Sequence, residues 1–276
     1  MGYGVKFWGV RGSIACPSPE CVIYGGNTSC LELTLGGRTL ILDAGTGIRQ
    51  LGQGLLSRGV TRATLLLTHT HWDHICGFPF FAPAFHPDFT LTVMAGHLGG
   101  GEGAIRSVLA RQMEGPTFPV PLSTMRSHLD FVDFRAGDRF GLFGDVAVRS
   151  APLRHPNDAT GYRVEYGGAS VCYVTDTEHV PGQPDDNILD LIAGADLVIY
   201  DSTYDDAECA AWIGWGHSTW QEGIRLCRRA GAKRLAIFHH APEHDDVFMA
   251  GLEREATANW EGALVARDGM ELALLP

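Results

Sequence analysis

Short apolar runs that stop at polar or glycine residues recur along the whole chain. Runs of four to eight residues with this make-up are typical of buried β-strands. Two further short strands are expected near the C-terminal end. The other predicted strands cover residues 5–10, 30–35, 39–43, 65–68, 90–94, 131–134, 146–153, 162–166, 170–175, 197–200 and 234–238.

Apolar residues three and four positions apart predict helices between several of these strands. Thr219 and Glu222 have the spacing of a capping box at one helix start, and Gly231 lies where a helix-ending glycine belongs. Strands dominate, then alternate with helices, then dominate again, which indicates a layered α/β fold. We expect a single domain over residues 1–276. The predicted helices cover residues 48–57, 105–113, 187–192, 219–229 and 246–259.

The composition fits a protein with a well-packed core. Of 276 residues, 45% are hydrophobic, which is enough to bury a substantial core. The sequence has no run of 18 apolar residues and no stretch that resembles a signal peptide, so we expect a cytoplasmic protein without a membrane span. Seven cysteines without a C-x-x-C pair favour reduced thiols over a disulfide framework or a thiolate zinc site.

The net charge of −11 changes the range of expected partners. Long nucleic acids usually need a basic face, so they are unlikely partners for this chain. One basic cluster lies in the last turns of the helix at 219–229 and just beyond it, where cations are also favoured by the helix dipole. We therefore favour a solvated helix end over a nucleic-acid patch. The cluster consists of Arg225, Arg228, Arg229, Lys233 and Arg234.

The densest group of polar residues follows the predicted strand at 65–68. His69, His71, Asp73 and His74 stand within six residues. Histidine is the commonest metal ligand near neutral pH, and residues i and i+2 of an extended chain point the same way. With Asp73 and His74 in the following turn, this stretch could give two ligands to each of two divalent ions. The alternative is a polar loop with chance histidines.

This H-x-H-x-D-H pattern resembles the signature of the metallo-β-lactamase superfamily of two-metal hydrolases. The resemblance implies a four-layer αββα sandwich, with further ligands at the ends of later strands. It places His69, His71 and His155 on one metal, and Asp73, His74 and His239 on the other, with Asp176 bridging both. His240 is the alternative to His239. Neighbouring side chains on a strand point oppositely, so only one of these two is expected to bind.

Ligands that supply nitrogen and oxygen without thiolate suit Zn²⁺, although Mn²⁺ and Fe²⁺ remain candidates. The resemblance implies that a hydroxide bridging the two ions is the nucleophile. Asp43 ends the strand at 39–43 and resembles an aspartate that orients ligands in the superfamily without binding metal itself. We therefore expect a dinuclear site with Asp43 as its support.

Two later motifs resemble those of ribonuclease Z and related phosphodiesterases. Asp201, in the segment 196–204, takes the place of a glutamate in that branch, and His217 lies in its G-H-S-T motif. The resemblance implies that the two side chains pair and that His217 protonates the leaving oxygen. A carboxylate partner keeps a histidine protonated near neutral pH. Asp73, Asp201 and His217 are therefore the candidate catalytic residues.

The chain is thus expected to be a metal-dependent phosphodiesterase. Common bacterial ribonuclease Z carries a long tRNA-clamping arm between the third histidine motif and the bridging aspartate, whereas residues 155–176 leave room only for a hairpin. A small phosphodiester is therefore the expected substrate: a cyclic nucleotide, a cyclic phosphate or an oligonucleotide end. Candidate pocket-lining residues are Trp72, Phe78, Trp212 and Trp215.

Two other functions remain open at this point. The same site could hydrolyse a lactone, a thioester or a β-lactam, or the chain could be a non-catalytic sensor that contains metal. Relatives in the superfamily are often dimers, so a homodimer is a further expectation.

Overall fold

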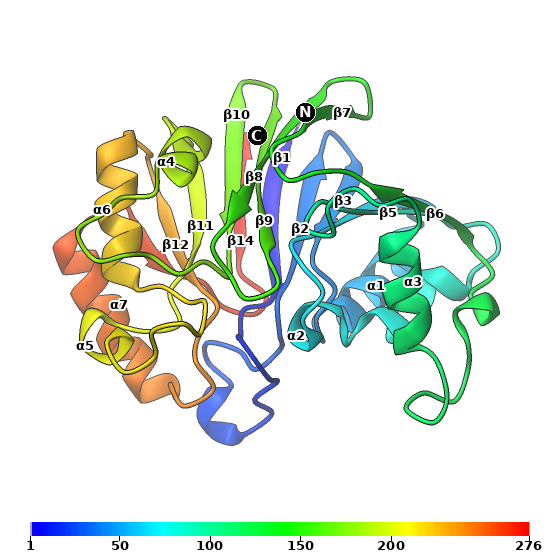
Figure 1. Cartoon of the computed structure of the whole chain (residues 1–276), viewed down its shortest axis with the longest axis horizontal. Coiled ribbons are helices and arrows are strands. Elements are labelled where there is room, and N and C mark those ends of the chain that lie inside the picture. Colours follow the sequence, from blue (N-terminus) through cyan, green and yellow to red (C-terminus); the bar gives the residue numbers. More distant parts are fainter. Residues whose placement is uncertain (1, 276) are drawn as a thin grey trace.

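Two seven-stranded β-sheets lie face to face in the computed structural model, which describes residues 2–275 (Figure 1). The strand orders are β14-β1-β2-β3-β4-β5-β6 and β13-β12-β11-β10-β9-β8-β7. The first sheet consists of β1 (Tyr3–Gly9), β2 (Cys30–Leu35), β3 (Arg38–Leu42), β4 (Arg62–Leu67), β5 (Thr90–Ala95), β6 (His128–Asp133) and β14 (Glu271–Leu275). The second consists of β7 (Arg139–Leu142), β8 (Val146–Leu153), β9 (Ala159–Tyr166), β10 (Ala169–Val174), β11 (Leu197–Asp201), β12 (Leu235–Phe238) and β13 (Ala263–Val265).

Helices cover the outer face of each sheet (Figure 1). The first sheet carries α1 (Ile48–Ser57), α2 (Trp72–Ile75) and α3 (Ala104–Gln112). The second carries α4 (Asp186–Ile192), α5 (Asp206–Cys209), α6 (Trp220–Ala230) and α7 (Asp246–Asn259). Short 3₁₀ turns lie at Pro19–Cys21, Phe78–Phe80, Ala82–Phe85 and Leu122–Thr124.

Three hydrophobic clusters fill the spaces between the four layers. The cluster between the sheets draws on both of them, with Phe7 and Leu33 from one and Tyr173 and Phe238 from the other. A second cluster packs α4, α6 and α7 against the second sheet, and a third packs α1 and α3 against the first. The central strands β10, β11 and β12 are buried on both faces and read as continuous apolar runs, whereas strands nearer the edges, such as β6 and β7, alternate. The predicted αββα sandwich is confirmed.

Parallel strands at the centre of each sheet place the polar residues that follow them at one edge. β3 and β4 are parallel neighbours in the first sheet, as are β10, β11 and β12 in the second. Parallel strands share the direction of their carboxyl ends, where ligand sites of such sheets usually form. Most of the predicted site residues lie at or just after the ends of these strands, whereas His155 follows the antiparallel strand β8 and His217 lies in the loop before α6.

The predicted strands and helices are present, with a few differences at edges and short elements. The strand predicted at 131–134 is β6, which begins at His128, and β7 and α5 were not expected. β7 is a four-residue edge strand that contains Gly141, and α5 is a single turn held by a capping box between Asp205 and Glu208. Neither is long enough to show a hydrophobic period. Within residues 2–275, no helix combines the length and apolar character needed to cross a bilayer.

Candidate metal centre

The early polar cluster continues directly from β4. His69 is buried, and His71 is the extended residue that precedes α2. Asp73 and His74 lie in α2, a four-residue helix, where the sequence predicted a turn. The change from extended to helical backbone after His71 separates His69 and His71 from Asp73 and His74.

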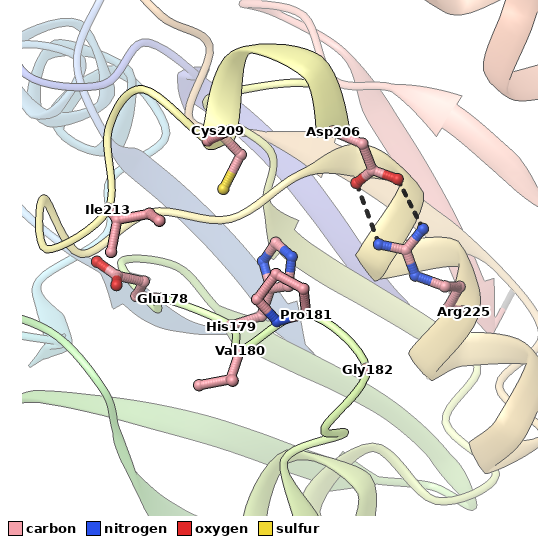
Figure 2. A pocket seen from close by; sticks show the side chains of 10 residues that line it. Glu178, His179, Val180, Pro181, Gly182, Asp206, Cys209, Ile213 and Arg225 are labelled. Carbon is pink, nitrogen blue, oxygen red and sulfur yellow. Dashed lines mark hydrogen bonds and ion pairs between the residues drawn. The ribbon is translucent and has the colours of Figure 1, made fainter.

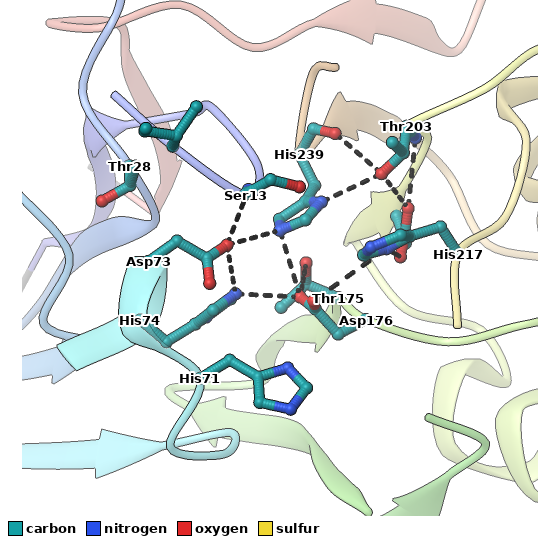
Figure 3. A network of polar contacts seen from close by, with 12 residues as sticks. Ser13, Thr28, His71, Asp73, His74, Thr175, Asp176, Thr203, His217 and His239 are labelled. Carbon is teal, nitrogen blue, oxygen red and sulfur yellow. Dashed lines mark hydrogen bonds and ion pairs between the residues drawn. The ribbon is translucent and has the colours of Figure 1, made fainter. Parts of the chain in front are cut away.

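Three polar residues outside this cluster adopt an unusual backbone conformation just after a strand. Asp43, Asp176 and His239 have φ angles of 61°, 61° and 64°, respectively. The left-handed region costs about 1–2 kcal/mol for a residue with a side chain, so it persists only where the surroundings enforce it. Figure 3 shows Asp176 and His239 pointing toward Asp73 and His74 from the opposite sheet. Strain of this kind is concentrated at functional sites.

The side chains form two groups that meet at Asp176. The three-histidine group consists of His69, His71 and His155. Nε2 of His155 lies 3.0 Å from Nδ1 of His71. Oδ1 of Asp176 faces this group, 3.8 Å from Nε2 of His69 and 3.6 Å from Nε2 of His155. The group is therefore built from three imidazoles beside one carboxylate oxygen.

The aspartate–histidine group consists of Asp73, His74, Asp176 and His239. Oδ2 of Asp176 faces this side, 3.1 Å from Nε2 of His74 and 3.4 Å from Nε2 of His239. Oδ2 of Asp73 lies 3.3 Å from each of the same two nitrogens. The two oxygens of Asp176 thus point to different groups, which is the arrangement that a bridging carboxylate requires.

Hydrogen bonds to Nδ1, on the outer side of each ring, fix the orientation of three of the histidine rings. Nδ1 of His74 lies 2.8 Å from a carboxylate oxygen of Asp43, and Nδ1 of His155 lies 2.8 Å from the carbonyl oxygen of Gly216. Both partners can only accept, so Nδ1 carries a hydrogen and Nε2 is the nitrogen that faces inward. Nδ1 of His239 lies 2.9 Å from Oγ1 of Thr203. Orientation of metal-binding histidines by such partners is general in metal sites.

Two buried nitrogens identify what the centre accommodates. Within residues 2–275, buried Nε2 of His69 makes no hydrogen bond. Nε2 of His74 is also buried and makes no well-aligned one, although oxygens of Asp176 and Asp73 lie 3.1 and 3.3 Å from it. Buried polar atoms are normally paired, and these two point into a cluster of further nitrogen and carboxylate donors. The residues present therefore fit divalent cations.

The electrostatics also favour positive charge at the centre. Burial disfavours the charged carboxyl of Asp176, but His239 and His74 outweigh it and hold its pKa well below the usual range. Burial likewise opposes the charge on His74, yet Asp176 and Asp73 raise its pKa well above the usual value. For His69, burial and the neighbouring His74 lower the pKa. The carboxyl of Asp176 is therefore held in its charged form by positive charge beside it, which is the charge state that a metal ligand needs.

A further pair lies beside the two groups. Nδ1 of His217 is 2.9 Å from Oδ2 of Asp201, and the same nitrogen is 3.9 Å from Oδ1 of Asp176. Burial opposes charge on His217, but Asp201 outweighs it and raises the pKa of this imidazole to about 9. The His217 ring also stacks on His239, with ring centroids 4.9 Å apart. A protonated imidazole thus stands at the edge of the cation site.

Comparison with known proteins agrees with this geometry. A family model described as "Beta-lactamase superfamily domain" matches residues 38–240 of the chain. The chain belongs to this family. Its members share the fold of metal-dependent hydrolases, and the present superfamily member is such an enzyme.

Individual relatives extend over nearly the whole chain. Ribonuclease Z of Exiguobacterium sp. (strain ATCC BAA-1283 / AT1b) is 26% identical over 293 residues, covering 89% of this chain and 93% of its own length. The metallo-beta-lactamase fold protein YhfI from Bacillus subtilis has a TM-score of 0.75 at 19% identity, with 99% of each chain covered. Zn²⁺-bound PqqB from Methylobacterium extorquens has a TM-score of 0.72 at 18% identity, covering 98% of this chain and 99% of its own.

His239 and its neighbour His240 point in different directions in this superfamily member. His240 is fully buried, and its Nε2 lies 2.9 Å from the carbonyl oxygen of Ala266. Burial lowers the pKa of His240 to about 3. The structure brings His239, and not His240, to the two groups. Both histidines follow the end of β12, and His239 has a left-handed backbone, so they diverge at a turn rather than by alternation along a strand.

Of the aromatic residues considered as pocket lining, three lie at the surface and one does not. Trp72 is 77% exposed, and Trp212 and Trp215 also reach solvent. Phe78 is fully buried in the cluster that packs α1 against the first sheet, so its prediction as a lining residue was wrong. Phe78 closely follows the polar motif at residues 69–74 in the sequence, but its side chain packs in the hydrophobic core.

The basic cluster near α6 is largely paired. Arg225 binds both Asp206 and Glu222, Lys233 lies 2.6 Å from Asp196, and Arg228 donates to the carbonyl oxygen of Asn259. These contacts favour the solvated helix end over a nucleic-acid patch.

Three contributors to the centre escaped the sequence reasoning. The backbone N–H of Ser13 donates to Oδ2 of Asp73 at 2.8 Å, and Thr203 and Gly216 hold His239 and His155. Thr203 and Gly216 lie beside the motifs of Asp201 and His217, which gave a signal that could have been followed. Ser13 acts through its backbone, and its side-chain type gives no such signal.

Proposed function

We propose that this superfamily hydrolase is a dinuclear metal-dependent phosphodiesterase acting on a small phosphodiester. A cyclic nucleotide, a cyclic phosphate or an oligonucleotide end has the appropriate size and chemistry. The observation that carries the proposal is the His217–Asp201 pair, whose atoms lie 2.9 Å apart beside the cation site. A departing alkoxide needs a proton, and a carboxylate-supported imidazolium supplies one.

The proposed ligands follow the two groups. His69, His71 and His155 would hold one ion, and Asp73, His74 and His239 the other, with Asp176 between them. When bound, two such ions lower the pKa of a water molecule and neutralise charge on phosphoryl oxygens. Nitrogen and oxygen donors without thiolate support Zn²⁺, as does the Zn²⁺-bound relative, and Mn²⁺ or Fe²⁺ also suit this set.

The chain's own residues divide the remaining work. As the oxygen of a water molecule forms a new bond to phosphorus and the P–O bond to the leaving group breaks, Nε2 of His217 would give its proton to the departing oxygen, since Nδ1 is hydrogen-bonded to Asp201. Asp201 keeps that proton on His217 before the reaction, and it accepts the N–H groups of Thr177 and Thr203 as well. These bonds hold the carboxylate in place for the imidazolium.

The region between His155 and Asp176 supports a small substrate. It contains the hairpin of β9 and β10, joined at Gly167 and Gly168. Together with a net charge of −11, this argues against a long polyanion as substrate. The relative named ribonuclease Z supports phosphodiester chemistry at the site, whereas the substrate proposed for this chain is smaller.

A substrate panel tests the proposal directly. The purified chain, loaded separately with Zn²⁺, Mn²⁺ or Fe²⁺, is assayed against 2′,3′-cyclic and 3′,5′-cyclic nucleotides, bis(p-nitrophenyl) phosphate and short RNA ends. We expect turnover of at least one phosphodiester and loss of turnover in His217→Ala with metal content unchanged. Hydrolysis of a lactone, thioester or β-lactam with every phosphodiester untouched would overturn the proposal. Absence of stoichiometric metal and of all ester hydrolysis would favour a non-catalytic sensor.

A further inference from the structure

Glu178 lies two residues beyond the central aspartate and contacts the loop that leads to His217. Its Oε2 atom accepts hydrogen bonds from the backbone N–H groups of Gly214 and Gly216, each at 2.8 Å. Bonds from backbone donors to a charged acceptor are among the stronger hydrogen bonds in proteins. One carboxylate oxygen therefore fixes both ends of the turn at Gly214–Gly216.

The backbone of Glu178 is fixed at the same time. Its N–H donates to the carbonyl oxygen of Arg154 at 2.7 Å, and Arg154 directly precedes His155. Glu178 thus ties together three separate segments: the end of β10, the turn that carries His155, and the loop before His217. All three carry residues of the candidate metal centre.

Gly216 transmits this restraint to a metal-ligand candidate. Its carbonyl oxygen lies 2.8 Å from Nδ1 of His155, which leaves Nε2 facing Asp176. Gly216 has a φ of +87°, and a Cβ atom there would lie 2.2 Å from Nδ1 of His155. Only glycine can bring its carbonyl this close in this conformation. The position of the Gly216 carbonyl therefore depends on the backbone turn that Glu178 holds.

We propose that Glu178 is a positioning residue for the metal centre, which fixes the Gly214–Gly216 turn so that Gly216 orients His155. The inference rests on the proposed function, because it takes His155 as a ligand. Glu178 is half-buried at the wall of a cavity of about 660 Å³, with Ile213 beside it (Figure 2). Its side chain lies outside the three hydrophobic clusters, so substitution there leaves the packed layers intact.

The test measures metal affinity rather than activity. Glu178→Ala and Glu178→Gln are each loaded with two equivalents of Zn²⁺ and titrated with a competing chelator. Loss of an outer partner of a ligand typically lowers metal affinity about 10- to 100-fold. We expect that loss for one of the two ions in Glu178→Ala. The amide oxygen of Glu178→Gln can still accept from both N–H groups, so this variant should keep the wild-type affinities.

A second comparison separates positioning from general damage. In a His155→Ala background, Glu178→Ala should cause no further loss of metal affinity, because its target is already gone. If Glu178→Ala fails to fold, Glu178→Asp replaces it; the shorter side chain cannot reach both N–H groups and should also weaken one ion. Wild-type affinities in the Ala or Asp variant, or equal losses in the Gln variant, would overturn the role of Glu178. A wild-type chain that binds no divalent ion would instead overturn the proposed function itself.

Discussion

The two groups that meet at Asp176 differ in charge and in burial. The three-histidine group contributes only imidazoles of its own, and His71 is partly open to solvent. The aspartate–histidine group contains two carboxylates, and all its members are at least nine-tenths buried. Charge attracts a cation more strongly where water is excluded. The buried group should therefore hold its ion more tightly, and the three-histidine group should be the side that substrate and chelators reach first.

Asp176 is the residue whose loss should remove this difference altogether. Asp176→Ala takes one oxygen from each group, so both ions should be lost. Each ion supplies several kcal/mol of transition-state stabilisation, so we expect phosphodiester turnover to fall about 10⁴-fold. Metal content by elemental analysis and kcat/KM on the best panel substrate measure the two effects. The control is Asp88→Asn, which changes an exposed carboxyl that is not part of either group. Retention of one full ion in Asp176→Ala would show that the groups are independent.

The pair beside both groups should affect chemistry without affecting metal. In His217→Ala, the leaving oxygen lacks its proton donor, so kcat should fall about 10²- to 10³-fold. The loss should be larger for a nucleotide substrate than for bis(p-nitrophenyl) phosphate, because p-nitrophenolate leaves readily without a proton. Equal losses on both substrates, or loss of metal, would assign His217 to binding rather than to proton transfer.

The same pair predicts a pH dependence. Asp201 raises the pKa of His217 to about 9, so the donor is protonated below that pH and loses its proton above it. Bound dications lower this value, so activity should decline at or below about pH 9. Asp201→Asn removes the carboxylate and should move the decline to lower pH. A pH–kcat profile in which both proteins coincide would contradict the assignment.

The sequence alone pointed to the early residues of the candidate site more directly than to the later ones. His69, His71, Asp73 and His74 are contiguous and follow an apolar strand, so spacing alone marks them as a candidate site. His155, Asp176 and His239 are single residues at strand ends, and their selection depended on the resemblance to a superfamily.

The physical reason is that the later residues depend on three-dimensional contacts. Asp176 and His239 adopt left-handed backbone conformations that no local pattern of side chains requires. The layers of the sandwich followed from apolar runs, whereas β7 and α5 are too short to show any period. Ser13 contributes only its backbone N–H, which leaves no side-chain signal. Ligand roles and the single-domain organisation stay predictions.

Thr203 offers a matched test for the buried group. Its Oγ1 lies 2.9 Å from Nδ1 of His239 and donates to Asp201, so it orients the ring as Gly216 orients His155. Thr203→Val keeps the shape and removes these bonds. We expect about a tenfold loss of affinity for the more tightly held ion in a chelator titration, whereas Thr203→Ser should retain it. Weakening of the more loosely held ion instead would reverse the assignment of affinities to groups.

Trp72 lies between His71 and Asp73 in the chain, and its 77% exposed side chain offers an accessible apolar surface next to a residue of each group. If a base of the substrate stacks there, Trp72→Ala should lose about 1 kcal/mol of binding, or about fivefold in KM, with kcat little changed. Trp72→Phe should keep most of that binding, because it still offers a ring. Val247→Ala, at an equally exposed position on α7, controls for loss of surface apolar area.

The decisive comparison uses a 2′,3′-cyclic nucleotide and ribose 2,3-cyclic phosphate, which lacks a base. A rise in KM confined to the nucleotide would place the base over the open three-histidine side, whereas equal rises would show that Trp72 acts on the metal loop rather than on the substrate.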